Sequence, residues 1–534
     1  MWRRAANHPW SGTIPVTSRL APSSDARAEA RRYLLRNVVS NGAFVVLPSL
    51  VSLWFVPYAI RHLGVAVYGL IALATSVTNF FGVLTGSFNS AASRYLTMEL
   101  ARGDNAAANR TFNSALSGGA LVAAAILPIS LALVFAAPRL FRIPSGQEIA
   151  FRWLFAATAG GFLVTALGSA FQVSSFARSR FDLQNSVGVA SLLLNRGVVV
   201  ALFAALTPSL WHVGTGILAG VLVSLVGSIV IWRHLTPQLH IRPWTSSRSL
   251  VVDMIGMGSW LTLGQVGFMA HVGTDIVVAN LILGPLAAGT YAPLLQLSVL
   301  TRSMASTMVR VITPVAVAGY ACDGMAGTLA VTRRAMNILG LLMALPIGLL
   351  CGLAKPFLAL WLGPSFQGVA TVLSIMIFPL CVNLAVAPIG EAAIALNKVR
   401  WPSTITLITG LIQIALALAL AKWSGWGISG IAVAGALALT LNRAVFMPAY
   451  GAAIMKTRWL ALLLPLIPGI VGAVVLGALA YGISQVWAIR TWPGLISLVT
   501  LLSGLYGVVV YSLVLQPGDR ALARNLLRRQ ALVR

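Results

Sequence analysis

The chain has 534 residues, of which 58% are hydrophobic and only 9% are charged. Because soluble domains carry about 25% charged residues, this composition excludes an ordinary soluble protein and indicates one made for lipid. The formal net charge of +26 would suit nucleic-acid binding, but the positions of the basic residues along the chain favour another explanation.

Residues 1–37 form a basic N-terminal tail with seven arginines. No apolar stretch precedes a small-residue cleavage site here, so we expect no cleaved signal peptide. In the final segment, 516–534, Arg520, Arg524 and Arg528 recur every four residues. Both tails are compatible with amphipathic helices on an anionic membrane surface, and the first is equally compatible with a solvated tail.

Apolar runs separated by turn residues fill the rest of the chain. A bilayer core about 30 Å thick takes about 20 apolar residues of helix, and backbone in lipid must satisfy its own hydrogen bonds. The sequence therefore predicts an all-α integral membrane protein with about 14 transmembrane helices. In chain order the expected spans are 38–60, 67–92, 114–137, 153–176, 184–206, 213–234, 254–281, 287–308, 335–354, 366–390, 402–421, 427–450, 459–483 and 493–515.

The Lys and Arg residues divide unequally between the two sides of these spans. If the N-terminus is cytoplasmic, 27 lie on the cytoplasmic side, 7 lie on the other side and 3 fall inside spans. This asymmetry is the positive-inside pattern, with Arg139, Arg142 and Arg152 as its largest exception. We therefore expect both termini to be cytoplasmic, and we expect the charge to set topology rather than to bind nucleic acid.

A short pattern occurs twice, 220 residues apart, and each copy joins one apolar span to the next. It consists of Leu-Gly followed by Tyr and Gly, at residues 63, 64, 68 and 69 and again at 283, 284, 291 and 289. The offset contains six expected helices, an even number, so both copies enter the membrane in the same direction. The chain is thus predicted to hold two parallel repeats around a central cavity.

The expected organisation places a six-helix bundle at 38–235 and a second one at 254–450. A polar cytoplasmic linker, 236–253, separates them, and a terminal helix pair occupies 451–515. Prolines inside several spans, among them Pro379 and Pro388, predict bends. The three cysteines form no CxxC pair, so we expect no metal site, disulfide framework or cofactor.

The stretch RHLGVAVYGL…SAASRYLTMELARGDNAAAN resembles the first two helices and first cytoplasmic loop of the oligosaccharide/polysaccharide flippases. These belong to a superfamily with the multidrug/toxin extrusion exporters and the peptidoglycan-precursor flippases. The matching elements here are Leu63-Gly64, Tyr68-Gly69, Arg94-Tyr95 and Gly103-Asp104. The span count, the two halves and the expected internal termini agree with this family over roughly 35–515.

The resemblance implies a flippase that moves an undecaprenyl-diphosphate-linked oligosaccharide across the inner membrane of a bacterium. Its expected partners are the lipid-linked oligosaccharide and membrane lipids, and a polysaccharide polymerase with its chain-length machinery is a candidate partner. The motif identifies the superfamily more strongly than it identifies a substrate. A multidrug/toxin extrusion-type antiporter of the same fold therefore stays open as the alternative.

Four arginines are candidates for binding an anionic head group. Arg196, Arg302 and Arg443 fall inside spans, where an ionisable residue costs at least about 2.5–3.5 kcal/mol. The forked guanidinium suits a diphosphate, which would otherwise cross hydrocarbon at a prohibitive cost. Arg94, at the inner end of the second span, is placed to receive the head group. The alternatives are arginines that bond helix carbonyls or snorkel to the interface, and for Arg94 a topology anchor.

His271 and Asp275 form the strongest acid–base pair, four residues apart on one face of span seven. An acid here can bind a proton or Na⁺ and bias the two halves between inward and outward states. The alternative is a polar pair that satisfies itself, or an aspartate paired with an arginine of a neighbouring helix.

Enzymatic signals are weak. No phosphate-binding glycine loop, HExxH motif or carboxylate pair stands out. Membrane glycosyltransferases and polymerases resemble one another in large outer loops with acids, whereas the first outer loop here, 62–67, has none. We therefore expect a transporter and no enzyme. A multidrug exporter would favour an acidic cavity for cationic drugs, while this chain has three span arginines and one clearly buried acid, Asp275.

Overall fold

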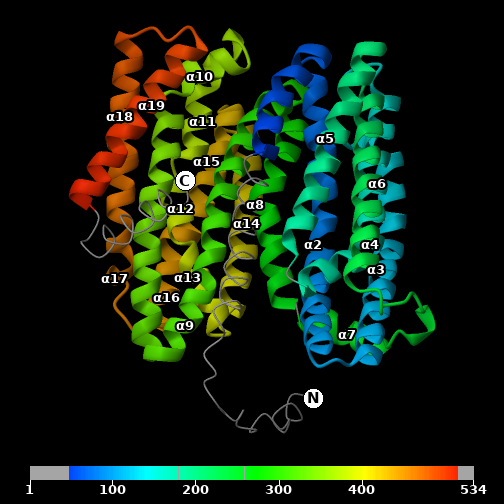
Figure 1. The fold of residues 1–534 in the computed structure, drawn as a ribbon. Coiled ribbons are helices and arrows are strands. Elements are labelled where there is room, and N and C mark those ends of the chain that lie inside the picture. Colours follow the sequence, from blue (N-terminus) through cyan, green and yellow to red (C-terminus); the bar gives the residue numbers. More distant parts are fainter. Residues whose placement is uncertain (1–46, 179, 258, 515–534) are drawn as a thin grey trace, which may run out of the picture.

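The computed structural model describes residues 47–178, 180–257 and 259–514, and the regular elements within them are all helices. Two groups of long, roughly upright helices lie side by side (Figure 1). The first group, residues 47–257, is here called the first lobe, and residues 259–454 are the second lobe. The basic tails expected at 1–37 and 516–534 lie outside the described residues.

The first lobe contains six long helices that run alternately up and down. They are the helix 47–63, α2 (Val65–Ala101), α3 (Asn105–Leu140), α4 (Glu148–Ala177), α5 (Phe181–Ala205) and α6 (Leu210–Leu235). Asp104 begins α3, because its carboxylate accepts a hydrogen bond of 2.9 Å from the amide of Ala107. Gly103, with φ of 73°, makes the turn before it. The Gly-Asp loop noted in the sequence is therefore a helix N-cap.

The segment that follows α6, near the end of the first lobe, is fixed to α3 by two asparagine side chains. Asn109 donates to the carbonyl of Gln238 and accepts from the amide of His240, at 3.0 and 2.8 Å. Asn113 donates to the carbonyl of His240 at 2.9 Å and accepts from the amide of Arg242 at 2.7 Å. Each side-chain amide thus imitates a neighbouring strand, which satisfies extended backbone without a sheet. A short turn η2 (Pro243–Thr245) and helix α7 (Arg248–Met257) follow.

The second lobe repeats the pattern with more interruptions. It comprises α8 (Ser259–Val278) with the π-helical turn η3 (Ala279–Leu283), α9 (Pro285–Gly352), α10 (Ala354–Trp361), η4 (Pro364–Val369), α11 (Ala370–Ile377), α12 (Leu380–Ala385), α13 (Ala387–Ala395), α14 (Arg400–Lys422), α15 (Gly427–Thr440), η5 (Leu441–Phe446) and α16 (Met447–Ile454). Gly324, with φ of 59°, divides α9 into two spans. Pro379 and Pro388 stand where α11, α12 and α13 are separated, so the bends expected from these prolines are present.

A terminal pair of helices packs on one side of the second lobe. It contains α17 (Leu460–Leu463), η6 (Leu464–Leu466), α18 (Ile467–Val486), α19 (Trp492–Val509) and η7 (Val510–Val514). Glycines bring α18 against the second half of α9, because a Cβ on Gly469 would lie 2.7 Å from the carbonyl carbon of Gly340. Small residues at helix contacts are the usual means of packing in lipid.

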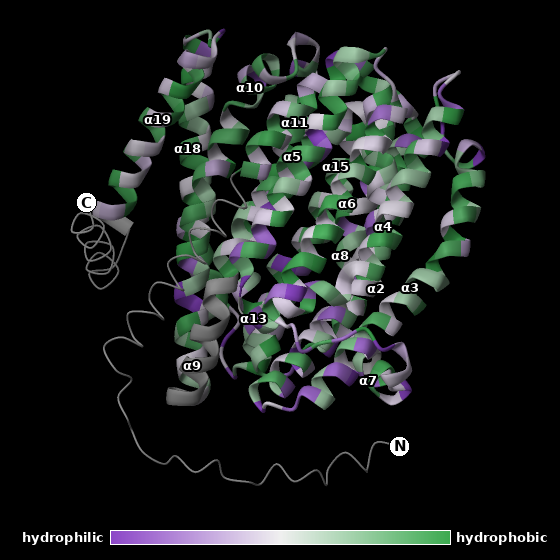
Figure 2. Ribbon diagram, turned by 45° about the vertical axis from the view of Figure 1, so that its right-hand side comes forward, coloured by the Kyte–Doolittle hydropathy of each residue, from purple (hydrophilic) through white to green (hydrophobic). Residues whose placement is uncertain are grey.

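The prediction of an all-α membrane protein is confirmed. Twelve helical segments among the described residues are long and apolar enough to cross a membrane. The helix 47–63 and the part of α9 before Gly324 correspond to the other two expected spans. Hydrophobic residues cover the middle of the molecule, and hydrophilic residues gather around α7 and the neighbouring turns (Figure 2).

The repeated Leu-Gly pattern forms the same structure in both lobes. Gly64 has φ of 82° and ψ of 159°, and Gly284 has φ of 97° and ψ of 179°. Each glycine immediately precedes the second helix of its lobe, α2 or α9, in a conformation that side chains disfavour. These turns lie at the end of the molecule that carries α10, hereafter the α10 end, and the opposite end is the α7 end (Figure 1).

Candidate functional site

The polar centre of the second lobe forms where α8 and α14 pack closely. A Cβ on Gly267 would lie 2.5 Å from the amide nitrogen of Leu407, and one on Gly410 would lie 2.8 Å from the carbonyl oxygen of Gly267. Glycine is therefore required for this approach. One turn further along each helix, the close packing allows His271 and Asp275 of α8 to reach Gln413 of α14.

Gln413 connects the two ionisable residues of α8. Its amide nitrogen donates to Asp275 Oδ1 at 2.8 Å and to the backbone carbonyl of His271 at 3.0 Å. Its carbonyl oxygen lies 2.5 Å from His271 Nδ1. His271 Nε2 lies 3.1 Å from the hydroxyl of Thr409, also on α14. His271, Asp275 and Gln413 are all buried, with exposed fractions of 4%, 6% and 1%.

The second oxygen of Asp275 is bonded by another helix. The hydroxyl of Tyr291, on α9, donates to Asp275 Oδ2 at 2.9 Å. Among the described residues, no Lys, Arg or His nitrogen lies within 4.0 Å of this carboxylate. Asp275 is thus a buried acid whose hydrogen bonds come from neutral donors, and its carboxylate has no direct ion pair among the described residues.

A cavity adjoins this carboxylate. It is small and partly open, and its polar lining comes from His271, Asp275, Tyr291, Ser298, Arg302 and Asn383. Asn383, on α12, is 4% exposed, and neither its side-chain oxygen nor its nitrogen has a hydrogen-bond partner among the described residues. Unpaired amide groups at a buried position are costly, so Asn383 is available to a small polar or ionic occupant.

Arg302 and Arg443 lie beside the network rather than within it. Arg302 Nε is 3.4 Å from the hydroxyl of Ser298, one turn earlier on α9. Arg443 belongs to the π-helical turn η5, and Arg302 is within electrostatic reach of both Arg443 and Asp275. The neighbouring Asn442 is buried and donates to the hydroxyls of Thr406 and Thr409 at 3.2 and 2.9 Å.

Arg196 lies in the first lobe, on α5. Its guanidinium carbon is 4.0 Å from the ring centroid of Phe55, a cation–π contact. Its Nε is buried and has no hydrogen-bond partner among the described residues, and Tyr68 is within electrostatic reach. Arg94 is exposed at the α7 end of α2. The structure therefore gathers His271, Asp275 and Arg302 around one cavity and leaves Arg196 and Arg94 elsewhere.

Several polar residues of this site were not found from the sequence. Gln413, Tyr291, Thr409, Asn383 and Asn442 are neutral, and their spacing to Asp275 follows no motif. The available signal is that polar side chains are unfavourable in apolar spans, as with Gln413 in LIQIALALAL. The polar neighbours that α8 itself offers are less informative, because Gln265 is exposed and Thr274 bonds the carbonyl of Ala270 in its own helix.

Within the described residues, two six-span lobes with a terminal pair define a polytopic helical membrane protein, with buried ionisable residues beside a cavity of the second lobe. The sequence pattern of the family described as "Polysaccharide biosynthesis protein" matches residues 34–318. The chain belongs to this family. It is also 29% identical over 493 residues to the uncharacterized membrane protein EpsK of Bacillus subtilis (strain 168), covering 92% of this chain and 98% of EpsK.

Solved transporters share the fold at low sequence identity. An inward-facing multidrug resistance MATE family transporter of the MOP superfamily aligns with a TM-score of 0.62 at 16% identity, over 78% of this chain and 98% of its own. The lipid II flippase MurJ, in an inward closed conformation, aligns with a TM-score of 0.62 at 14% identity, over 89% and 98%. An outward-facing MATE family structure gives 0.54 at 14% identity, over 79% and 95%.

Proposed function

We propose that this protein flips an undecaprenyl-diphosphate-linked oligosaccharide across the bacterial inner membrane by alternating access, driven by an ion gradient. In this proposal both termini and the α7 end are cytoplasmic, as the distribution of basic residues indicates. The family match and the fold shared with MurJ support a lipid-linked substrate. The diphosphate head group and the ion coupling are proposed on the residues described below.

The head-group assignment rests on the surroundings of Arg196. Its guanidinium lies in an apolar span, stacks on Phe55 and keeps a buried Nε without a partner among the described residues. An arginine left with an unused donor suits an anion that is present only part of the time. Arg302, which faces the cavity of the second lobe, supplies a second donor. Arg443 and the exposed Arg94 complete the proposed head-group path.

Asp275 and His271 are the proposed coupling residues. The two carboxylate oxygens of Asp275 accept hydrogen bonds from Gln413 and Tyr291. The same carboxylate lines the cavity beside Asn383, where a cation can bind it. Binding a proton or Na⁺ there neutralises a buried carboxylate that has no direct ion pair, and a ligand that prefers one conformation shifts the population toward it. Arg302 shares this cavity, so an arriving cation and the head group influence one another electrostatically.

The head-group assignment is tested with Arg196→Ala, Arg196→Lys and the surface control Arg61→Ala. We expect Arg196→Ala to lower binding of undecaprenyl diphosphate by the purified protein at least ~10-fold, a loss of about 1.4 kcal/mol. Arg196→Lys should keep part of the affinity, since it retains the charge and loses the fork. Unchanged binding and export by Arg196→Ala at wild-type protein levels would exclude the role.

The competing function is efflux of cationic drugs, because MATE family transporters share the fold and Asp275 is a buried acid beside a cavity. Cells that overproduce the protein separate the two. Raised resistance to cationic dyes that depends on Asp275, without any change in polysaccharide export on deletion of the gene, would favour the exporter. Loss of export on deletion, with unchanged drug resistance, would favour the flippase.

A further inference from the structure

The two lobes touch backbone to backbone at the α10 end. A Cβ on Gly289, in the first turns of α9, would lie 1.9 Å from the carbonyl oxygen of Val65 in α2. A Cβ on Gly69 of α2 would lie 2.5 Å from the amide nitrogen of Gly289. These distances exclude any side chain at either position in this conformation. Gly69 and Gly289 are also the glycines of the repeated sequence pattern, so the contact joins equivalent points of the two lobes.

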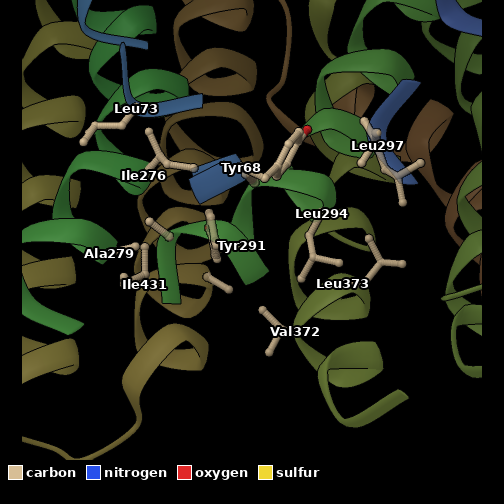
Figure 3. Close-up of a cluster of buried hydrophobic side chains, with 14 of the residues drawn as sticks. Tyr68, Leu73, Ile276, Ala279, Tyr291, Leu294, Leu297, Val372, Leu373 and Ile431 are labelled. Carbon is tan, nitrogen blue, oxygen red and sulfur yellow. The ribbon is translucent and has the colours of Figure 1, made fainter. Parts of the chain in front are cut away.

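The hydrophobic core also differs between the two ends of the molecule. At the α10 end one continuous cluster contains residues of both lobes, including Tyr68 and Leu73 of α2 with Ile276, Tyr291 and Leu297 (Figure 3). Among the side chains that the structure describes, the clusters at the α7 end are separate. One contains first-lobe residues around Phe112 and Trp232, and another contains second-lobe and terminal-pair residues around Ile389 and Met447. For these side chains, the lobes share one cluster at the α10 end and form separate clusters at the α7 end.

Hydrogen bonds between the lobes reinforce the closed end. The side chain of Asn280, in η3, accepts from the amide of Arg142 and donates to its carbonyl, both at 3.0 Å. Trp361, in α10, donates from Nε1 to the carbonyl of Leu53 at 2.7 Å. Asn280 is fully buried. These bonds hold the loop that follows α3 and the helix 47–63 of the first lobe to the second lobe.

We propose that the contact between Gly69 and Gly289 is the gate that closes the α10 end, and that Tyr291 links it to Asp275. At this point the two glycine backbones can meet and part without a rotamer change of their own, because neither residue has a side chain. Tyr291 lies two residues beyond Gly289 on α9 and bonds the Asp275 carboxylate. A change at Asp275 therefore acts on the helix turn that forms half of the gate. The link rests on the proposed coupling role of Asp275, whereas the gate itself does not.

The gate is tested by measuring the opening of the α10 end directly. Ser145, in the loop before α4, and Ser365, in η4, are both exposed at this end, one in each lobe. Spin labels on Ser145→Cys and Ser365→Cys, in a background free of the natural cysteines, report the distance between the lobes. We expect Gly289→Ala to shift the distance distribution to longer values, and Gly69→Ala to do so less, in the order of the contacts. Gly82→Ala, in α2 with nothing within 4 Å of its Cβ position, should leave the distribution unchanged.

Size-exclusion profiles and unfolding temperatures show whether each variant is folded. If Gly289→Ala does not fold, the milder Gly69→Ala decides the question. A wild-type distance distribution in the folded glycine variants overturns the gate, and so does an equal shift in Gly82→Ala. The measurement needs neither substrate nor ion gradient, so the gate can stand even if the flippase assignment fails. The link is tested in the same labelled protein with Tyr291→Phe, whose distribution should lose its response to pH or Na⁺ if Tyr291 transmits it.

Discussion

The two lobes share one helix order and a glycine before the second helix, yet among the described residues only the second lobe has a clearly buried acid. In the first lobe the ionisable group inside a span is Arg196, which contacts Phe55 and has an Nε without a hydrogen-bond partner among the described residues. The second lobe holds two span arginines, Arg302 and Arg443, together with Asp275, whose hydrogen bonds come from the neutral donors of Gln413 and Tyr291. The repeat thus gives both lobes a common frame, and the acid of the second lobe is the feature that suits the proposed cation.

Removing the charge of Asp275 is the strongest way to test this division. Asp275→Asn keeps the size of the side chain but replaces two acceptors by one acceptor and one donor. We expect gradient-driven translocation in proteoliposomes to fall at least ~10-fold, which corresponds to about 1.4 kcal/mol of lost coupling. Asp253→Asn, on the exposed side of α7, is the matched control. Equal rates for Asp275→Asn and the wild type, under imposed pH and Na⁺ gradients, would assign this carboxylate a structural role.

Gln413→Ala breaks the same network without touching a charge. It removes the bonds to Asp275, to the His271 ring and to the His271 carbonyl, and the buried partners it leaves cost about 1–3 kcal/mol each. We expect a lower unfolding temperature in detergent and a smaller loss of translocation than for Asp275→Asn. Gln367→Ala, at an exposed position in η4, should unfold like the wild type. An unchanged unfolding temperature for Gln413→Ala would mean that these hydrogen bonds contribute little to the stability of the protein.

Much of the fold follows from local features of the sequence. Apolar length predicts the spans, Gly64 and Gly284 predict the matched turns, and Pro379 and Pro388 predict the breaks, since each depends on its own neighbours in the chain. The linker is different. It was expected at 236–253 as a polar connection, and nothing local indicates that Asn109 and Asn113 would hold it against α3.

The site residues likewise divide into those that the sequence indicates and those that it does not. His271 and Asp275 are recognisable because they are four residues apart on one helix, and Arg302 because a charge in an apolar span is unusual. Gln413 lies 138 residues from Asp275, so its role depends on how α8 and α14 pack. That packing depends on contacts of Gly267 and Gly410, and a single sequence does not indicate that these two glycines meet. The assignments of head-group and coupling residues stay predictions, and the structure supplies their geometry.

The most local of these changes is a matched pair of substitutions, one in each lobe. Tyr68 and Tyr291 are both buried near the start of the second helix of their lobe (Figure 3). The Tyr291 hydroxyl donates to Asp275 at 2.9 Å, whereas no hydrogen bond of the Tyr68 hydroxyl is seen among the described residues. A hydrogen bond to a charged group contributes about 1.5–3 kcal/mol, so Tyr291→Phe should lower the unfolding temperature, and Tyr68→Phe should change it little.

Thermal unfolding of both variants in the same detergent makes the comparison direct, because each substitution removes one hydroxyl from a buried ring. Lowering the pH until Asp275 is protonated should shrink the difference, since the hydroxyl then faces a neutral acid and the bond loses its charge-assisted part. Equal shifts for the two variants would show that the hydroxyls are interchangeable. The asymmetry between the lobes would then rest on the aspartate, with no contribution from the two tyrosines.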